Sequence, residues 1–332
     1  MNFDLTLVWA GIIGFAVCAY VVMDGFDLGI GILFPLLERG QDRNAAVNSV
    51  APVWDGNETW LVLGGGGLLA AFPLAYAVIM PAVYVPVTLM LLGLVLRGVA
   101  FEFRARTTRL WVWDAAFAGG SILAAAMQGV ILGAVLQGIA VHGRAYAGGW
   151  WDWLTPFSLL TGAAVVIGYG LLGATWLIYR TEAGLQARCH ALALWFGGGT
   201  LAALAAVSAA TPFLSYDYHS RWLRAPGLYA TAPMPVLVAI VGFGLYRSVR
   251  RKAELAPFLL SLALFLLSFV GLGISMFPYI VPPSITLWQA ASPSSSQVFM
   301  LVGVAIMVPI ILAYTGYAYW VFRGKVGHEG YH

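Results

Sequence analysis

Charged side chains are scarce in this sequence. They make up 9% of its 332 residues, whereas hydrophobic residues make up 61%. An ordinary soluble domain contains roughly 25% charged residues, so the composition excludes a soluble globular protein. The net charge of +3 comes from basic residues in short loops rather than from a basic stripe or tail, and nucleic acid is therefore not an expected partner.

Cysteine and histidine are also few, and their positions form no ligand pattern. Cys18 and Cys189 lack the spacing of a metal site or a disulfide framework. No histidine falls in the middle of a long apolar run; the five are His142, His190, His219, His328 and His332. Because haem irons and redox metals favour imidazole or thiolate ligands, we expect this chain alone to hold no haem and no metal.

Sequence motifs of common soluble enzymes are absent as well. The chain has no nucleophile elbow of the Gly-x-Ser-x-Gly type, no phosphate-binding glycine-rich loop and no His-Glu-x-x-His. An ordinary hydrolase or ATPase is therefore disfavoured, and we assign no residue a catalytic role. The first apolar run lacks a basic leader and is too long for a secretory signal, so it is expected to be a retained membrane span.

Long apolar runs dominate the sequence. A membrane helix needs about 20 mainly apolar residues, and nine segments reach this length. They run approximately over residues 5–37, 51–74, 76–103, 112–140, 154–179, 187–214, 228–246, 255–281 and 297–322. The sequence therefore predicts an all-α polytopic membrane protein with about nine transmembrane helices, organised as a single integral membrane domain over residues 1–332.

Basic residues predict the orientation, because short cytoplasmic loops hold an excess of Lys and Arg. With the N-terminus periplasmic, thirteen of the seventeen basic residues fall on the cytoplasmic side: Arg39, Arg43, Arg104, Arg106, Arg109, Arg180, Arg188, Arg247, Arg250, Arg251, Lys252, Arg323 and Lys325. Only Arg144, Arg221 and Arg224 fall outside, and Arg97 lies within a span. We therefore expect an odd number of crossings and a cytoplasmic C-terminus in the inner membrane of a bacterium.

Six ionisable residues lie in the first three apolar segments, at about the same depth on the cytoplasmic side. They are Asp24, Asp27, Asp55, Glu58, Arg97 and Glu102. Ionisable groups in hydrocarbon are costly, so each is a candidate functional residue. The spacing of three residues places Asp24 with Asp27, and likewise the acids of the second segment with each other, on one helix face.

Two interpretations of this acidic group stay open at the level of sequence. In the first, Arg97 and Arg104 neutralise the acids, and the ion pairs hold three helices together without further chemistry. In the second, the neighbouring carboxylates hold and relay protons from the cytoplasm. The residue types and their spacing fit both interpretations.

Four strings of residues carry a family resemblance. They are Asp24-Gly25-Phe26-Asp27-Leu28-Gly29, Trp54-Asp55-Gly56-Asn57-Glu58-Thr59-Trp60, Arg97-Gly98-Val99-Ala100-Phe101-Glu102-Phe103-Arg104 and Met276-Phe277-Pro278-Tyr279. In this order they resemble subunit II of the cytochrome bd-type quinol oxidases, from the first segment to the eighth. The Trp-Asp-Gly-Asn string is the most specific of them.

The resemblance implies a fold and a function. Subunit II of that family has nine spans, arranged as two four-helix bundles plus a peripheral helix, and pairs with a haem-bearing subunit I. The pair oxidises quinol and reduces dioxygen to water. Two b-type haems and one d-type haem are expected in the partner, in agreement with the missing mid-span histidines. A structural quinone in subunit II and a small accessory subunit are further expectations from the family.

The resemblance also assigns roles and shows one departure. Asp24, Asp27, Asp55 and Glu102 match acidic positions of the family that would serve proton delivery. Many relatives carry Asp after the Trp of Leu287-Trp288-Gln289-Ala290, and Gln289 cannot ionise. This departure makes the cyanide-insensitive branch of the family a candidate.

Two functions remain as alternatives to an oxidase subunit that delivers protons. One is a proton-coupled secondary transporter with its substrate path between the acidic helices, although no internal repeat typical of transporters is seen. The other is an assembly scaffold of the oxidase that moves no protons.

Overall fold

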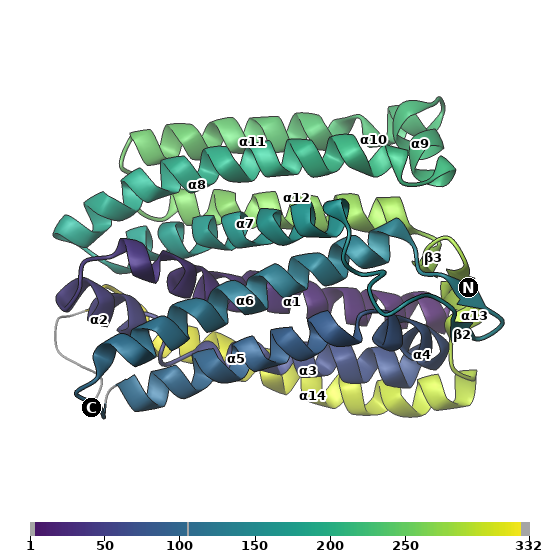
Figure 1. Cartoon of the computed structure of the whole chain (residues 1–332), viewed down its shortest axis with the longest axis horizontal. Helices are drawn as coiled ribbons and strands as arrows, with labels where there is room; N and C mark the ends of the chain where they lie inside the picture. The colour runs from purple at the N-terminus through teal and green to yellow at the C-terminus, as the bar shows by residue number, and fades with distance from the viewer. Residues whose placement is uncertain (1–3, 105, 327–332) are drawn as a thin grey trace.

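The computed structural model describes residues 4–104 and 106–326. Its long helices run almost side by side along one axis (Figure 1). They are α1 (Leu5–Leu33), α3 (Trp54–Ala71), α5 (Tyr84–Arg104), α6 (Leu110–Gln137), α7 (Pro156–Arg180), α8 (Ala183–Ala210), α11 (Pro233–Arg250), α12 (Ala256–Met276) and α14 (Ser294–Val321). Because α1 begins at one end of the molecule and α14 finishes at the other, the chain crosses its length an odd number of times.

Short elements connect these helices. The helical ones are η1 (Phe34–Leu36), α2 (Gln41–Asn48), α4 (Pro73–Ala82), η2 (Thr211–Phe213), α9 (Tyr216–Leu223), α10 (Gly227–Thr231) and α13 (Leu287–Ala290). Two small antiparallel hairpins pair β1 (Val141–His142) with β2 (Ala145–Tyr146) and β3 (Tyr279–Val281) with β4 (Ile285–Thr286). They close loops at the end of the molecule where α1 begins (Figure 1).

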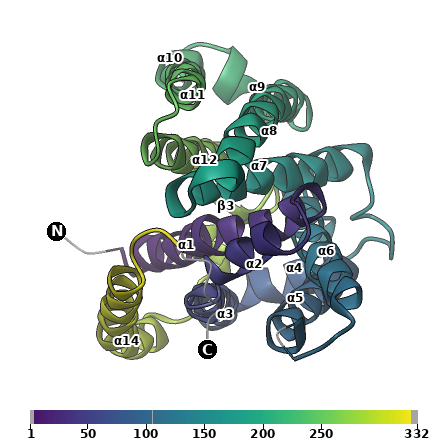
Figure 2. The same cartoon turned by 90° about the vertical axis from the view of Figure 1, so that its left-hand side faces the viewer.

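The long helices form two four-helix groups, as the resemblance implies. In the first group α1 packs on α3 and α6, and α5 packs on α6. In the second group α7, α8, α11 and α12 each contact two neighbours, which closes a ring. The groups join through α7, which packs on both α1 and α6, and the end-on view shows them as a lower and an upper bundle (Figure 2).

Helix α14 is the peripheral helix, at the edge of the first bundle (Figure 2). It touches α1 and α3, and Gln297 is its one buried residue among those the structure describes. After α14 the chain returns to the second bundle, where Val326 N–H donates to the Arg180 carbonyl at 2.8 Å and Lys325 Nζ lies 3.0 Å from Glu254. The Lys325 hydrogen bond lowers the pKa of Glu254. The chain end thus ties α14 to α7 and to the loop between α11 and α12.

The second and third predicted spans are wrong in their boundaries. Helix α3 ends at Ala71, and α4 then turns by 120° relative to it, so residues 76–82 belong to α4 instead of to the third span. The cause is local: Phe72 precedes a proline, which disfavours the helical region, and has φ −131° and ψ 61°. The described residues contain eight helices long and apolar enough to cross a membrane, or nine when α3 and α4 count as one bent span.

The remaining predicted segments agree with the observed helices to within a few residues. The largest difference concerns the seventh, where a short α10 precedes α11 and the main helix starts at Pro233. Proline at the first position of a helix is favourable, because its missing N–H has no intrahelical partner there. An all-α architecture with about nine spans is therefore confirmed.

Glycine sets the distance between the two bundles. At Gly29 on α1, an added Cβ would lie 2.0 Å from the Tyr169 carbonyl oxygen and 2.7 Å from the backbone nitrogen of Gly173 on α7. Both neighbours are backbone atoms, which cannot move without shifting the helix. The α1–α7 crossing therefore depends on small residues, as close helix contacts in membranes generally do.

We predict that Gly29→Ala destabilises the protein by about 1–3 kcal/mol, the usual cost of overpacking. Thermal unfolding in detergent measures this loss. Gly11→Ala is the matched control on the same helix, because an added Cβ there meets no atom within 4 Å. Equal unfolding temperatures of the two variants would contradict the tight α1–α7 crossing.

Candidate functional site: a buried ion-pair cluster

Helix α1 presents two acids to the protein interior. Every residue from Asp24 to Leu33 is buried, and the exposed fractions of Asp24 and Asp27 are 1% and 0%. This stretch passes between the two bundles, so it has neighbours on all sides, and the glycines within it admit α7 closely. The carboxylates are therefore removed from both water and lipid.

Arg97 on α5 bridges the acids of two other helices. One of its terminal nitrogens, Nη2, lies 2.5 Å from Asp24 Oδ1 and 2.8 Å from Glu58 Oε1 on α3. The Arg97 side chain is fully buried, while the Glu58 side chain remains 29% exposed. The guanidinium carbon lies 5.3 Å from the ring centre of Trp54, which itself stacks on Phe101 of α5. Arg97 thus joins α5 to α1 and α3, which also pack directly on each other.

Asp27 has a different set of partners. Its Oδ2 accepts a hydrogen bond from Asn57 Nδ2 at 2.8 Å, and Asn57 Oδ1 in turn accepts one from the Tyr319 hydroxyl of α14 at 3.0 Å. Asn57 is 1% exposed. A chain of hydrogen bonds therefore runs from the peripheral helix through α3 to α1. We call Asp24, Asp27, Glu58 and Arg97 the ion-pair cluster.

A second polar chain approaches Asp24 from the centre of the molecule. The Tyr169 hydroxyl of α7 donates to Gln128 Oε1 of α6 at 2.6 Å, and Gln128 Nε2 donates to the Tyr20 hydroxyl oxygen at 2.8 Å. Tyr20 lies on α1 one helical turn before Asp24, and its hydroxyl oxygen accepts the hydrogen bond from Gln128. These neutral groups link α1, α6 and α7 through hydrogen bonds in a region with no water to replace them.

The structure brings four of the six predicted residues together and leaves two apart. Asp55 is exposed on α3 and forms no ion pair with the described residues. Glu102 is exposed too, and its nearest cation is Arg106 at 3.8 Å. The expectation that both acids of the second segment meet those of the first is therefore wrong for Asp55, since only Glu58 contacts Arg97.

The predicted role of Arg104 is also wrong. Its Nε lies 2.8 Å from Asp114 Oδ1 on α6, and Arg43 lies 2.7 Å from Asp114 Oδ2. Asp114 thus receives a cation on each oxygen and forms a separate ion-pair group with these two arginines. Asp114 lies at the N-terminal end of its apolar segment, close to a loop rich in arginine. Sequence analysis did not use this position as a signal for an ion pair.

Sequence analysis also missed the neutral members of the site. Asn57, Tyr319, Tyr20, Gln128 and Tyr169 come from five different helices. Amide and hydroxyl side chains are tolerated in membrane helices, so their identity alone does not mark them. A polar residue within an apolar run is a weak signal, and only the tertiary contacts show which ones face the acids.

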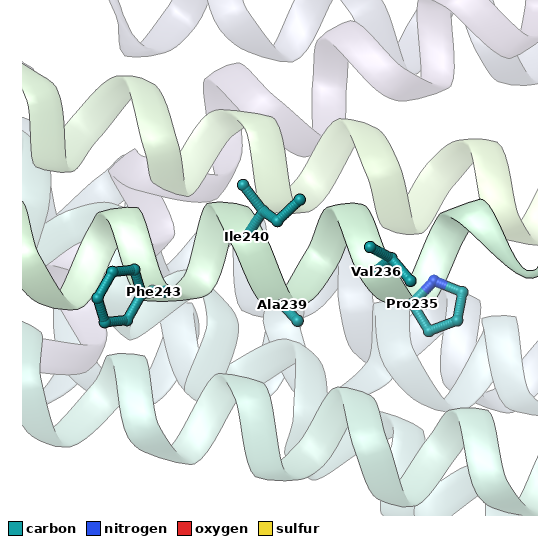
Figure 3. Close-up of a pocket in the computed structure, with 5 residues that line it drawn as sticks. All are labelled: Pro235, Val236, Ala239, Ile240 and Phe243. Carbon is teal, nitrogen blue, oxygen red and sulfur yellow. The ribbon is translucent and has the colours of Figure 1, made fainter.

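A shallow recess on α11 lies apart from the ion-pair cluster. It is lined by Pro235, Val236, Ala239, Ile240 and Phe243, all from one helix (Figure 3). Its lining has no ionisable side chain and no side-chain hydrogen-bond donor. Across residues 4–104 and 106–326, no three His, Cys, Asp or Glu residues are grouped to hold a metal ion. His328 and His332 lie outside the described residues.

Gln289, where the resemblance implies an acid, has a structural role at a helix start. Gln289 Oε1 accepts the Thr286 N–H at 2.8 Å and so closes a capping box at the start of α13. The adjacent Trp288 donates its indole N–H to Asp4 Oδ2 at 2.8 Å, and this hydrogen bond lowers the pKa of Asp4. An acid is thus present at this end of the molecule, at the N-cap of α1.

The two bundles of long apolar helices, with an ion-pair cluster buried in the first of them, define a multi-pass membrane protein. The comparisons with known proteins give its family. The family model of cytochrome bd terminal oxidase subunit II matches residues 5–322, and the chain belongs to this family. It is a subunit of a quinol:oxygen oxidoreductase of the bacterial inner membrane.

Individual relatives agree with this assignment. The chain is 31% identical to cytochrome bd-I ubiquinol oxidase subunit 2 of Escherichia coli strain K12, over 98% of this chain and 96% of that protein. It is 27% identical to cytochrome bd ubiquinol oxidase subunit 2 of Bacillus subtilis strain 168, over 97% and 96%. The bd oxidase of Geobacillus thermodenitrificans has the same fold, with a TM-score of 0.77 at 18% identity over 96% of this chain and 99% of that chain.

We predict that Arg97→Met destabilises the protein by about 3–5 kcal/mol, because it leaves the buried Asp24 and the partly exposed Glu58 without their cation. Thermal unfolding and the yield of assembled protein measure the effect. Arg106→Met is the matched control, since Arg106 lies 3.8 Å from Glu102 with 80% of its side chain exposed and such pairs contribute about 0–1 kcal/mol. Equal stability of the two variants would show that Arg97 does not hold the three helices.

Proposed function

We propose that this chain is the non-haem subunit of its oxidase, which supports a haem-bearing subunit I and delivers protons toward the site of oxygen reduction. The two b-type haems and the d-type haem reside in that partner. The N-terminus of this chain is periplasmic and its C-terminus is cytoplasmic. The observation that carries the proposal is the ion-pair cluster, which holds proton-binding groups inside a membrane protein of this family.

The histidines support a partner that holds the haems. His142 is exposed on β1 and His219 lies on the short helix α9, both at one end of the molecule. His190 is buried on α8, seven residues after the helix begins, and Lys252, Glu254 and Lys325 are the charged groups around it. Haem iron between membrane helices needs an axial ligand at mid-span, and this distribution does not offer one.

The exposed side of α3 supports proton transfer from this chain to the partner subunit. Asp55 is exposed, and Glu58 of the ion-pair cluster reaches the same surface with 29% of its side chain. A charged residue facing lipid costs about 2.5–3.5 kcal/mol on insertion scales. We therefore place the partner subunit on this face of α3, where it covers the two acids and receives protons from them.

The proposal extends to a structural quinone. The recess on α11 supplies apolar side chains for an isoprenoid tail (Figure 3). It supplies no hydrogen-bond donor for a quinone head group, so a quinone bound there would be a structural ligand and not the substrate. Quinol oxidation is assigned to the complex with subunit I, which a small accessory subunit would complete.

The experiment that tests the partnership is affinity purification through this chain, followed by an absorption spectrum. We expect a haem-bearing subunit to copurify, to show the red absorption band of haem d, and to oxidise quinol with dioxygen. A chain that purifies alone, without haem and without quinol oxidase activity, would contradict the proposal. Substrate uptake by such a chain in proteoliposomes would instead support the transporter alternative.

We predict that Asp55→Asn lowers quinol oxidase turnover by about tenfold or more at equal haem content, because a positioned proton-transfer group contributes about 10²–10⁴-fold to the rate of its step. Turnover of the purified complex, normalised to haem d, measures this effect. Glu38→Gln is the matched control, since Glu38 is an exposed acid beside Arg188 and lies outside the ion-pair cluster and the proposed proton route. Unchanged turnover of Asp55→Asn would favour the scaffold alternative.

A further inference from the structure

The ion-pair cluster contains more acid than base. Three carboxyl groups, those of Asp24, Asp27 and Glu58, share the single guanidinium of Arg97. If all three acids were ionised, two negative charges would remain uncompensated in a region where Asp24, Asp27 and Arg97 are at most 1% exposed. Like charges that close together in a poorly solvated site do not all ionise, and one carboxyl keeps its proton.

The contacts of the three acids differ in kind. Asp24 and Glu58 each accept a hydrogen bond from the Arg97 cation, at 2.5 Å and 2.8 Å. Such charge-assisted hydrogen bonds stabilise an ionised carboxylate. Asp27 accepts its one hydrogen bond from the neutral amide of Asn57, so it gains least from ionising.

Other charged and titratable groups around Asp27 do not change this ranking. On α1 its neighbour is Asp24, and on α3 it faces Glu58 beyond Asn57; both oppose a further negative charge. On α14 Tyr319 is neutral and reaches Asp27 only through Asn57. On α7 the nearest cation is Arg180, and its guanidinium lies against the ring of Trp176 at 5.3 Å.

We infer that the ion-pair cluster holds one resident proton and that it sits on Asp27. The two oxygens of Asp27 fit this state: Oδ2 accepts from Asn57, whereas Oδ1 has no hydrogen-bond donor among the described residues. We place the proton on Oδ1, the oxygen that accepts no hydrogen bond from the described residues.

The protonation of Asp27 does not require the proposed proton route. Only the use of this proton in oxygen reduction rests on the proposed function. In that route Asp27 is the donor that is already loaded, and Tyr319 with Asn57 are positioning residues that fix its carboxyl group. Asp24 stays ionised as the partner of Arg97 and does not exchange protons. The two aspartates, three residues apart on one helix, thus have different tasks.

Infrared spectroscopy of the complete oxidase tests the inference. With ¹³C-labelled aspartate, we expect the carbonyl stretch of a protonated carboxylic acid in the wild type, and we expect Asp27→Asn to remove it. Asparagine has the shape of the neutral acid, so this variant is expected to assemble with an unfolding temperature near that of the wild type. Asp114→Asn is the matched control, because arginines bind both oxygens of Asp114, and it should leave the band in place.

A band that is missing from the wild type, or that persists in Asp27→Asn, would overturn the inference. Should Asp27→Asn not assemble, Tyr319→Phe decides instead: it removes the hydroxyl that fixes Asn57, so the band must shift, and an unmoved band overturns the inference. Turnover of the same samples tests the proton route separately. Loss of the band with unchanged turnover keeps the proton on Asp27 and contradicts the proposed route.

Discussion

The contact of Arg97 with Asp24 and Glu58 is the constraint on which the first bundle depends. A lone guanidinium in hydrocarbon is costly, and two lone carboxylates are costly as well, so α1, α3 and α5 are stable in the membrane only as a group. The stacked rings of Trp54 and Phe101 complete the enclosure of the cation. The neighbouring contact continues the same arrangement: Asn57, the residue before Glu58 on α3, donates a hydrogen bond to Asp27.

Much of the architecture could be predicted because long apolar runs leave little freedom. The first segment and the last six became helices with ends close to those expected, since a membrane helix is set by length and apolarity alone. The region of Phe72 and Pro73 could not be placed in this way. Both sides of the break are apolar, and the 120° turn depends on a single residue whose backbone leaves the helical range. Hydropathy does not register such a change of direction.

The sequence predicted which charged residues form the candidate site, but it did not predict which partners each of them contacts. Spacing correctly placed Asp24 and Asp27 together, because one helix carries both. It failed for Asp55, since the rotation of α3 about its axis is fixed by packing, and this rotation turns Glu58 toward Arg97 and leaves Asp55 exposed. It failed again for Arg104, whose partner Asp114 follows on the next helix. The contribution of Tyr319, almost 300 residues after Asp24, depends on tertiary structure throughout.

The order of the partners along the chain has a consequence for biosynthesis. Asp24 and Glu58 are translated before Arg97, and Tyr319 is among the last described residues to be made. Helix α1 therefore leaves the ribosome with acids that have no cation, and its charge is balanced only after α5 has been synthesised. Asp24 therefore gains its cation only when α5, the third of the long helices, has been made. The hydrogen bond from Tyr319 to Asn57 closes the group last, so it marks a chain whose membrane insertion is complete.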